Sequence, residues 1–277
     1  MAPAEAPRSE IHSEEGAIEP VAAQALLRVE AVGVHFGGIV ALDGVSFEVE
    51  AGRIVGLIGP NGAGKTTLFN CLSRLYECGS GDILFNGVSL LQAPKHGIAA
   101  LGIGRTFQNL ALFRTMSVLE NVMVGHHCRT KSGFLVNALR LPWVTHEEHA
   151  TLEKAKNLIR FLGLEAVAGA RVADLPFGTQ KRVELARALA SDPKLLLLDE
   201  PASGLNHEEV GELGVLIQEI RDRLGLTVLL VEHHMSLVMS ISDRVVALNF
   251  GRKIAEGTPA EVQAHPEVIQ AYLGGAH

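Results

Sequence analysis

One run of nine residues has the types and the spacing of a phosphate-binding loop. Residues 59–67 read GPNGAGKTT and fit the pattern G-x-x-x-x-G-K-[ST] in full. Glycines let a backbone wrap closely around an anion, because they carry no side chain and tolerate positive φ. Lys65 would neutralise phosphate charge, and the Thr66 hydroxyl would bind Mg²⁺. The motif therefore predicts a nucleoside triphosphate site, made of Gly59, Pro60, Asn61, Gly62, Ala63, Gly64, Lys65, Thr66 and Thr67.

A second motif, LLLLDEP at positions 195–201, joins an apolar run to two adjacent carboxylates. In an open parallel sheet, ligands bind at the carboxyl ends of the strands, where this pair would lie. Asp199 is placed to hold Mg²⁺ through water, and Glu200 is the candidate to polarise an attacking water. Strands often end in acidic residues, so the assignment depends on the phosphate loop being present in the same chain.

Apolar runs and helical periods alternate around these motifs and indicate the elements that position them. The phosphate loop lies between an apolar strand at 54–58 and a helix-like run at 67–72. After Pro176 the same alternation returns, which is typical of a parallel sheet covered by helices. The predicted segments there are helices at 181–191 and 208–223 and strands at 195–198, 227–231 and 245–249.

These patterns predict an α/β fold with a P-loop NTPase core and a mainly parallel sheet. Alternating residues at 27–50 predict an N-terminal antiparallel β subdomain. Residues 118–163 are mostly helical in period, and we expect an α-helical subdomain inserted into the core at about 109–190. We expect one domain over residues 25–274, preceded by a disordered tail at 1–24 that is rich in Ala, Pro, Glu and Ser.

The bulk composition excludes several other classes of protein. The chain has 277 residues, of which 47% are apolar, enough for one large buried core. No apolar run approaches the ~18 residues of a membrane span. The net charge of −7, without a basic stripe, argues against broad nucleic-acid binding. Three dispersed cysteines without a C-x-x-C pair suit a reducing cytosol.

Residues 175–189, LPFGTQKRVELARAL, open a helix just before the Asp-Glu strand and resemble the signature loop of the ATP-binding cassette (ABC) ATPases. The resemblance covers nearly the whole chain and implies a Mg²⁺-dependent ATPase. In that family two cassettes sandwich ATP, and the signature of one contacts the γ-phosphate held by the other. The positions that match the family are Phe36 for adenine stacking, Gln108 for Mg²⁺ and the lytic water, Phe177, Gly178 and Thr179 for the γ-phosphate in trans, residues 203–206 for dimer contact, and His233 as the switch histidine.

Two positions depart from the family pattern. The signature usually reads LSGGQ, but here Pro176 replaces the serine and brings neither a hydroxyl nor an N–H. One hypothesis is that this half-site closes weakly and that an unlike partner cassette supplies a complete signature; the alternative is that the family tolerates the change at small cost. Asn206 replaces the usual aspartate of the dimer loop and keeps a hydrogen-bonding side chain without the charge.

Several strings resemble one subfamily, the ATP-binding subunits of branched-chain amino acid importers. They include RTFQNLALF at 105–113, SVLENV at 117–122 and EHHMSLVM at 232–239. The resemblance implies a second cassette, two permease subunits docked near residues 107–122, and a place in the cytoplasm on the inner face of the membrane. Residues 129–147 could bind a partner or pack the helical subdomain. A lipid or lipopolysaccharide export cassette and a non-transport ABC ATPase are the alternatives, and among import substrates amides and urea stay open beside leucine-type amino acids.

Overall fold

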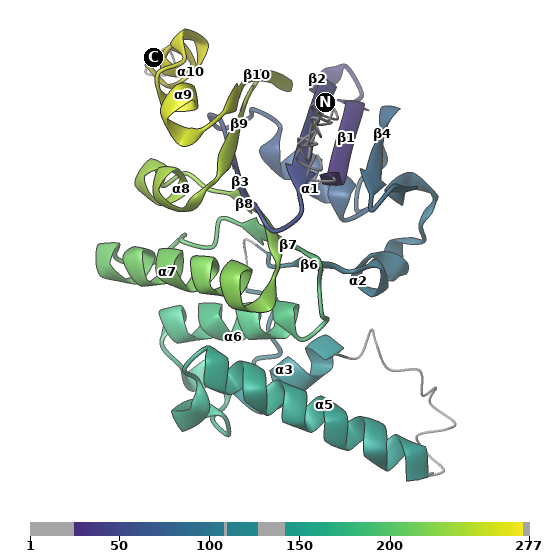
Figure 1. Cartoon of the computed structure of the whole chain (residues 1–277), viewed down its shortest axis with the longest axis vertical. Coiled ribbons are helices and arrows are strands. Elements are labelled where there is room, and N and C mark those ends of the chain that lie inside the picture. The colour runs from purple at the N-terminus through teal and green to yellow at the C-terminus, as the bar shows by residue number, and fades with distance from the viewer. Residues whose placement is uncertain (1–24, 108–109, 127–141, 274–277) are drawn as a thin grey trace, which may run out of the picture.

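The computed structural model describes residues 25–107, 110–126 and 142–273. The predicted tail at 1–24 and Gln108 lie outside the described residues, as does most of the segment 129–147. Figure 1 shows the sheets in the upper half of the molecule and a stack of helices below them.

A six-stranded sheet forms the centre of the molecule, with strand order β10-β9-β3-β8-β7-β6. Its neighbours pair in parallel except β10 with β9. Every residue of β3, β7 and β8 is buried, because helices or the second sheet cover both faces. The prediction of a mainly parallel sheet is confirmed. The strands are β3 (Ile54–Ile58), β6 (Ile103–Arg105), β7 (Leu195–Asp199), β8 (Thr227–Val231), β9 (Arg244–Asn249) and β10 (Arg252–Gly257).

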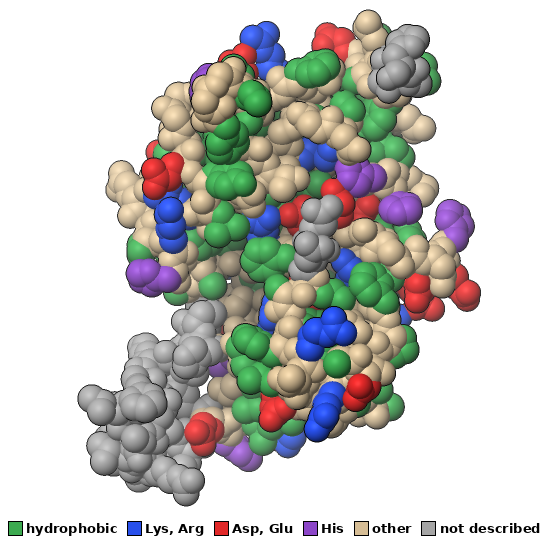
Figure 2. Space-filling view, turned by 180° about the vertical axis from the view of Figure 1, so that it is seen from behind, with side chains coloured by type: hydrophobic (Ala, Val, Ile, Leu, Met, Phe, Trp, Pro, Cys, Tyr) green, Lys and Arg blue, Asp and Glu red, His purple; other side chains and the backbone are tan. Residues whose placement is uncertain are grey.

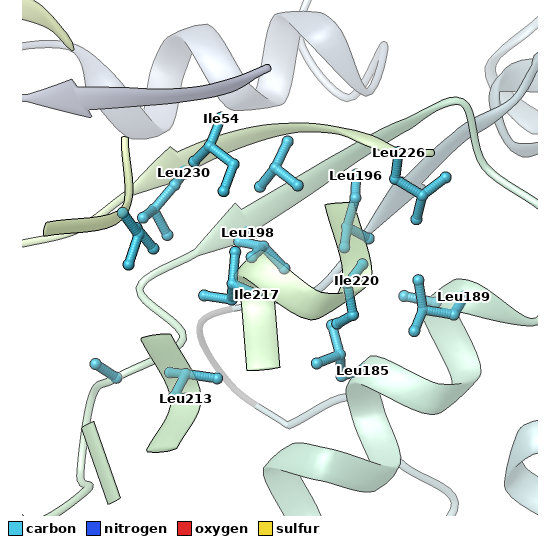
Figure 3. Packing of buried hydrophobic residues seen from close by; sticks show 14 of the residues in the cluster. Ile54, Leu185, Leu189, Leu196, Leu198, Leu213, Ile217, Ile220, Leu226 and Leu230 are labelled. Carbon is cyan, nitrogen blue, oxygen red and sulfur yellow. The ribbon is translucent and has the colours of Figure 1, made fainter. Parts of the chain in front are cut away.

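One face of this sheet packs against long amphipathic helices. Figure 3 shows Leu196 and Leu198 of β7 close to Ile217 and Ile220 of α7 (His207–Leu224), with Leu185 of α6 (Phe177–Leu189) beside them. These residues belong to one buried apolar cluster that also takes in β3, β8 and α8 (Met235–Ile241). The cluster fixes the carboxyl ends of β7 and β8 relative to each other.

The opposite face supports the predicted antiparallel β subdomain. A four-stranded sheet runs in the order β2-β1-β4-β5. Its apolar side chains form a second cluster with α1 (Lys65–Leu72) and with the other face of the central sheet; Phe69 of α1 is fully buried there. The strands are β1 (Ala25–Phe36), β2 (Ile39–Glu50), β4 (Ser80–Phe85) and β5 (Val88–Ser89).

The predicted helical insertion is also present. Helix α3 (Val118–His126) packs against α6 and against α5 (Pro142–Phe161), at the bottom of the view in Figure 1. Over the ranges that the structure covers, no helix has both the length and the apolar character to cross a membrane. The remaining elements are α2 (Ile98–Leu101), α9 (Pro259–Gln263), α10 (Pro266–Leu273) and 3₁₀ turns at Leu90–Gln92, Lys95–Gly97, Glu165–Val167 and Val172–Asp174.

Candidate functional site

The phosphate loop connects the buried strand β3 to α1 in a conformation that only glycine accepts at two positions. Gly59 has φ +152°, and a Cβ there would lie 2.3 Å from the carbonyl oxygen of Leu248 on β9. Gly64, the N-cap of α1, has φ +100°, and its Cβ would lie 2.6 Å from the carbonyl oxygen of Ala41 on β2. The loop is therefore pressed between the two sheets, which fixes its backbone before any ligand binds.

The predicted binding residues follow this path in order. Asn61 and Gly62 are exposed at the tip of the loop, and the Ala63 N–H donates to the Pro60 carbonyl at 3.1 Å. Thr66 is exposed in the first turn of α1, and Thr67 beside it is half-buried. The first turn of a helix has backbone N–H groups without partners inside the helix, so this end of α1 suits an anion.

Lys65 lies across the loop. Its side chain is 5% exposed, and Nζ donates to the carbonyl oxygens of Gly59 at 2.7 Å and Pro60 at 3.0 Å. Burial lowers the pKa of the Lys65 ammonium, while the carboxylates of Glu200 and Asp199 act in the opposite direction. The two carboxylates thus share an electrostatic environment with the loop lysine, as one nucleotide site requires.

Asp199 ends β7 and forms a buried ion pair with a residue that the motif reading missed. Arg105 Nη2 donates to Asp199 Oδ2 at 2.8 Å, while Nη1 donates to Ser73 Oγ at 2.8 Å and to the Phe69 carbonyl at 3.2 Å. Burial raises the pKa of the Asp199 carboxyl, and Arg105 opposes that rise. Arg105 therefore ties this carboxylate to the end of α1. The available signal was an arginine that directly precedes Thr106-Phe107-Gln108.

Glu200 and His233 come from the loops after neighbouring strands, and their side chains meet. His233 Nε2 lies 2.6 Å from Glu200 Oε1. Glu200 has φ +48°, an uncommon conformation for a residue with a side chain, and its N–H donates to the Val231 carbonyl at 2.9 Å. The glutamate side chain is 12% exposed and that of the histidine 44%. Figure 2 shows acidic and histidine side chains gathered near the middle of one face, between the sheets and the helical part.

Phe36, the predicted adenine platform, lies at the end of β1 and is 45% exposed. Its ring meets the ring of Tyr76 edge-on, with centroids 5.2 Å apart and an interplanar angle of 74°. An edge-on neighbour holds the ring while leaving a face open for stacking. The sequence reading did not single out Tyr76, since it stands in no motif.

The signature residues lie in the first turn of α6 rather than in a loop before it. The helix begins at Phe177, four residues earlier than predicted, with Pro176 as its N-cap at φ −55°. The Gln180 N–H donates to the Pro176 carbonyl at 3.0 Å, so hydrogen bonding within the helix starts there. The N–H groups of Phe177, Gly178 and Thr179 precede that bond and have no partner within the helix, a geometry that suits an anion.

A cavity of about 170 Å³ adjoins this terminus. Pro176, Gly178 and Thr179 line it together with residues of α6 and α7, and no residue of the phosphate loop does. The helix terminus is therefore separate from the phosphate loop of its own chain. Asn206 caps α7 in a full capping box: its own N–H donates to Glu209 Oε2 at 2.9 Å, and its Oδ1 accepts the N–H groups of Glu208 and Glu209, both at 3.0 Å. An amide oxygen makes these bonds without the charge of an aspartate.

The residues present suit a magnesium ion carried by a nucleotide. In the part of the chain that the structure describes, no group of three or more His, Cys, Asp or Glu side chains could hold a metal alone. Mg²⁺ prefers oxygen ligands and is commonly held by one or two protein groups together with phosphates and water. The Thr66 hydroxyl and the Asp199 carboxylate supply that kind of donor. Gln108, the third predicted ligand, lies outside the described residues.

Comparisons with known proteins agree with this geometry. The family described as ABC transporter matches residues 42–203, and the family described as branched-chain amino acid ATP-binding cassette transporter matches residues 252–277. The high-affinity branched-chain amino acid transport ATP-binding protein LivG of Salmonella typhimurium is 44% identical over 253 residues, which cover 91% of this chain and 99% of LivG. The corresponding protein BraF of Pseudomonas aeruginosa is 42% identical over 251 residues, covering 91% and 98%.

Two solved structures share the fold. A nucleotide-free ATP-binding cassette from an ABC transporter superposes with a TM-score of 0.78 at 30% identity, covering 90% of this chain and 99% of that one. The ADP conformation of the cassette MJ1267 gives a TM-score of 0.77 at 31% identity, covering 91% and 99%. The matched family spans more than half of the chain and includes the phosphate loop, the acidic motif and the signature. This chain is therefore a nucleotide-binding ATPase of the ABC transporter family.

Proposed function

We propose that this chain is the ATP-hydrolysing subunit of an importer for branched-chain or related amino acids. The observation that carries the proposal is the likeness to LivG and BraF, which spans nearly the full length of each of these proteins. The C-terminal match to the branched-chain family points to the same subfamily. We expect the chain to work in the cytoplasm on the inner face of the membrane, as a peripheral subunit.

ATP would bind with its phosphates on the loop Gly59–Thr67 and its adenine on Phe36. Lys65 would exchange its bonds to the Gly59 and Pro60 carbonyls for bonds to the β- and γ-phosphates. Bound Mg²⁺ supplies neutralisation of the charge that develops on the transferred phosphoryl group. Thr66, Asp199 and Gln108 are the residues proposed to hold it.

Glu200 would accept a proton from the attacking water, as a general base within hydrogen-bond reach. His233 Nε2 lies 2.6 Å from that carboxylate, and its N–H would turn to the γ-phosphate when ATP binds. Arg105 would keep the Asp199 carboxylate in place through its bond to Oδ2. Phe177, Gly178 and Thr179 would bind the γ-phosphate of a second cassette, and permease subunits would dock near residues 107–122.

The test separates hydrolysis from transport. The Glu200→Gln variant should bind ATP, form a stable ATP-bound dimer and lose turnover, while Glu165→Gln, which removes an exposed carboxylate paired with Arg160, should match the wild type. In cells that depend on this chain, uptake of radiolabelled leucine should be lost with Glu200→Gln and kept with Glu165→Gln. Turnover by Glu200→Gln would refute the role of that residue, and leucine uptake that does not depend on this chain would refute the substrate class.

A further inference from the structure

Glu232 is a buried acidic residue behind the site, to which the sequence motifs assign no role. It follows β8 directly and is 1% exposed. Its Oε1 accepts the N–H of Ala202 at 2.6 Å, and its Oε2 accepts the N–H groups of His233 at 2.9 Å and His234 at 3.3 Å. A buried carboxylate is costly unless it is hydrogen-bonded, and these three donors meet that need.

The three donors belong to two different segments of the chain. Ala202 lies two residues after Glu200, on the segment that leaves β7, while His233 follows β8. The carboxylate of Glu232 therefore bridges the two segments that carry the proposed base and the switch histidine. A second bond joins the same two segments in the same sense, because the Glu200 N–H donates to the Val231 carbonyl at 2.9 Å.

This bridge affects catalysis because the backbone conformation of Glu200 depends on the hydrogen bonds around it. A non-glycine residue at φ +48° keeps that conformation only where neighbouring contacts impose it. The bond from the buried N–H of Ala202 to Glu232 supplies one such contact, and the bond from Glu200 to Val231 supplies another. A side chain that fixes both segments also fixes how the Glu200 carboxylate meets His233.

We propose that Glu232 is a positioning residue for ATP hydrolysis, which sets the relative placement of Glu200 and His233. The inference rests on the roles given to those two residues under the proposed function. Glu232 is enclosed by protein and acts through backbone N–H groups, so it does not touch the nucleotide. Its loss should lower the rate of the chemical step and leave ATP affinity unchanged, since the phosphate loop keeps its own contacts.

The backbone bonds that hold Glu200 and Ala202 are continued into the predicted dimer-contact residues 203–206. The Ser203 N–H donates to the Glu200 carbonyl at 3.1 Å, and the Leu205 N–H donates to the Ala202 carbonyl at 3.1 Å. This loop is therefore anchored on the two residues that Glu232 and Val231 hold. A partner cassette that pressed on residues 203–206 would act on the placement of Glu200 through these bonds.

The first variant is Glu232→Gln. The glutamine amide has one oxygen and one NH₂ group in place of the two carboxylate oxygens. Its oxygen can accept the N–H of Ala202 or that of His233, and the NH₂ group then faces the N–H of the other residue. We expect kcat to fall by about 10- to 100-fold, as small misplacements of reacting groups do, while the Kd for ATP stays within about twofold. The matched control is Glu261→Gln, because Glu261 Oε2 also accepts a backbone N–H, from Thr258 at 2.8 Å, at the start of α9. The control should keep the wild-type kcat.

A double-mutant cycle separates positioning from an independent role. If Glu232 acts through Glu200, adding Glu232→Gln to Glu200→Gln should lower the residual rate by less than about twofold. A full further loss in the double variant would overturn the proposal. So would a wild-type kcat in Glu232→Gln, or a weakened ATP affinity with kcat retained.

If Glu232→Gln does not fold, Glu232→Asp replaces it, since the charge remains but the reach is one methylene shorter. A kcat at least about fivefold lower with unchanged ATP affinity then supports the proposal, and an unchanged kcat overturns it. Turnover retained by Glu200→Gln alone would instead refute the proposed base, so failure of the proposed function is distinguishable from failure of the role of Glu232.

Discussion

Replacing Pro176 with serine tests whether the unusual signature weakens closure of the ATP sandwich. Pro176 is the N-cap of α6, with φ −55° and ψ 151° and no side-chain hydrogen bond to the helix. A serine can adopt this extended conformation and would bring back the hydroxyl that the family pattern directs at the γ-phosphate. Pro176→Ser should therefore strengthen ATP-dependent dimerisation.

The magnitude follows from three terms. A hydrogen bond to a charged group contributes about 1.5–3 kcal/mol, which is roughly 10- to 150-fold in affinity for each composite site. A serine N-cap stabilises a helix by about 1 kcal/mol, and loss of the proline ring costs about 0.4–1 kcal/mol through the unfolded chain. The two stability terms nearly cancel, so Tm should move by no more than about 4 °C. A change in dimerisation of that size would then not arise from folding.

The assay is sedimentation of the Glu200→Gln protein over a range of ATP and protein concentrations, with and without Pro176→Ser. Pro176→Ala is the matched control, because it removes the ring and restores the N–H but supplies no hydroxyl. We expect the serine variant to dimerise at least about tenfold more tightly than both the parent and the alanine variant. Equal dimerisation of all three proteins would refute the weak half-site and support a family tolerance of this loop.

Two further predictions concern adenine binding and pH. Phe36→Ala should raise the Kd for ATP by roughly 5- to 150-fold, because stacking of a base on an aromatic ring contributes about 1–3 kcal/mol; isothermal titration would show it, and a change below twofold would refute the platform. Burial raises the pKa of the Glu184 carboxyl, whose Oε1 accepts the Phe107 N–H at 3.1 Å. Such a group stabilises the fold below its unfolded pKa of about 4.3, and that contribution is lost as pH rises through the folded pKa. Glu184→Gln should therefore gain stability over the wild type from pH 4 to pH 8 in urea titrations, and a constant difference would contradict the assignment.

The sequence predicts the central sheet because strands buried on both faces consist mainly of apolar residues. Strands β3, β7 and β8 are buried at every position and read as unbroken apolar runs. The short strand β6 has three residues, too few to show a period. The sequence predicts the start of α6 at Lys181 rather than at Phe177, because a Pro-Phe-Gly sequence is typical of a loop. Here the proline serves as the N-cap, and Gly178 is accepted in the first turn.

The candidate site also has one part that the sequence predicts and another that it does not. The phosphate loop and the Asp-Glu pair are contiguous, so their spacing alone predicts them. Arg105 and Asp199 are 94 residues apart in sequence, and Glu232 and Ala202 are 30 apart. Their contacts depend on the register of β6 against β7 and on the order of β7 and β8, which no local pattern contains. A charged residue at the end of a buried strand was the only signal, and it does not name its partner.

The topology explains why these residues form one site and why the helix terminus at Phe177 lies apart from it. Strands β3 and β7 both neighbour β8 in parallel, so the phosphate loop, the Asp199-Glu200 pair and the loop of His233 leave the same edge of the sheet. The helix terminus at Phe177 belongs instead to the helical part and opens beside a cavity that the phosphate loop does not line. One chain thus presents two separate helix N-termini, one beside a buried lysine and one with a proline cap. If each end holds the γ-phosphate of a different ATP, hydrolysis requires a second cassette, and an unlike partner whose signature keeps the serine would better complete the site on this chain's own phosphate loop.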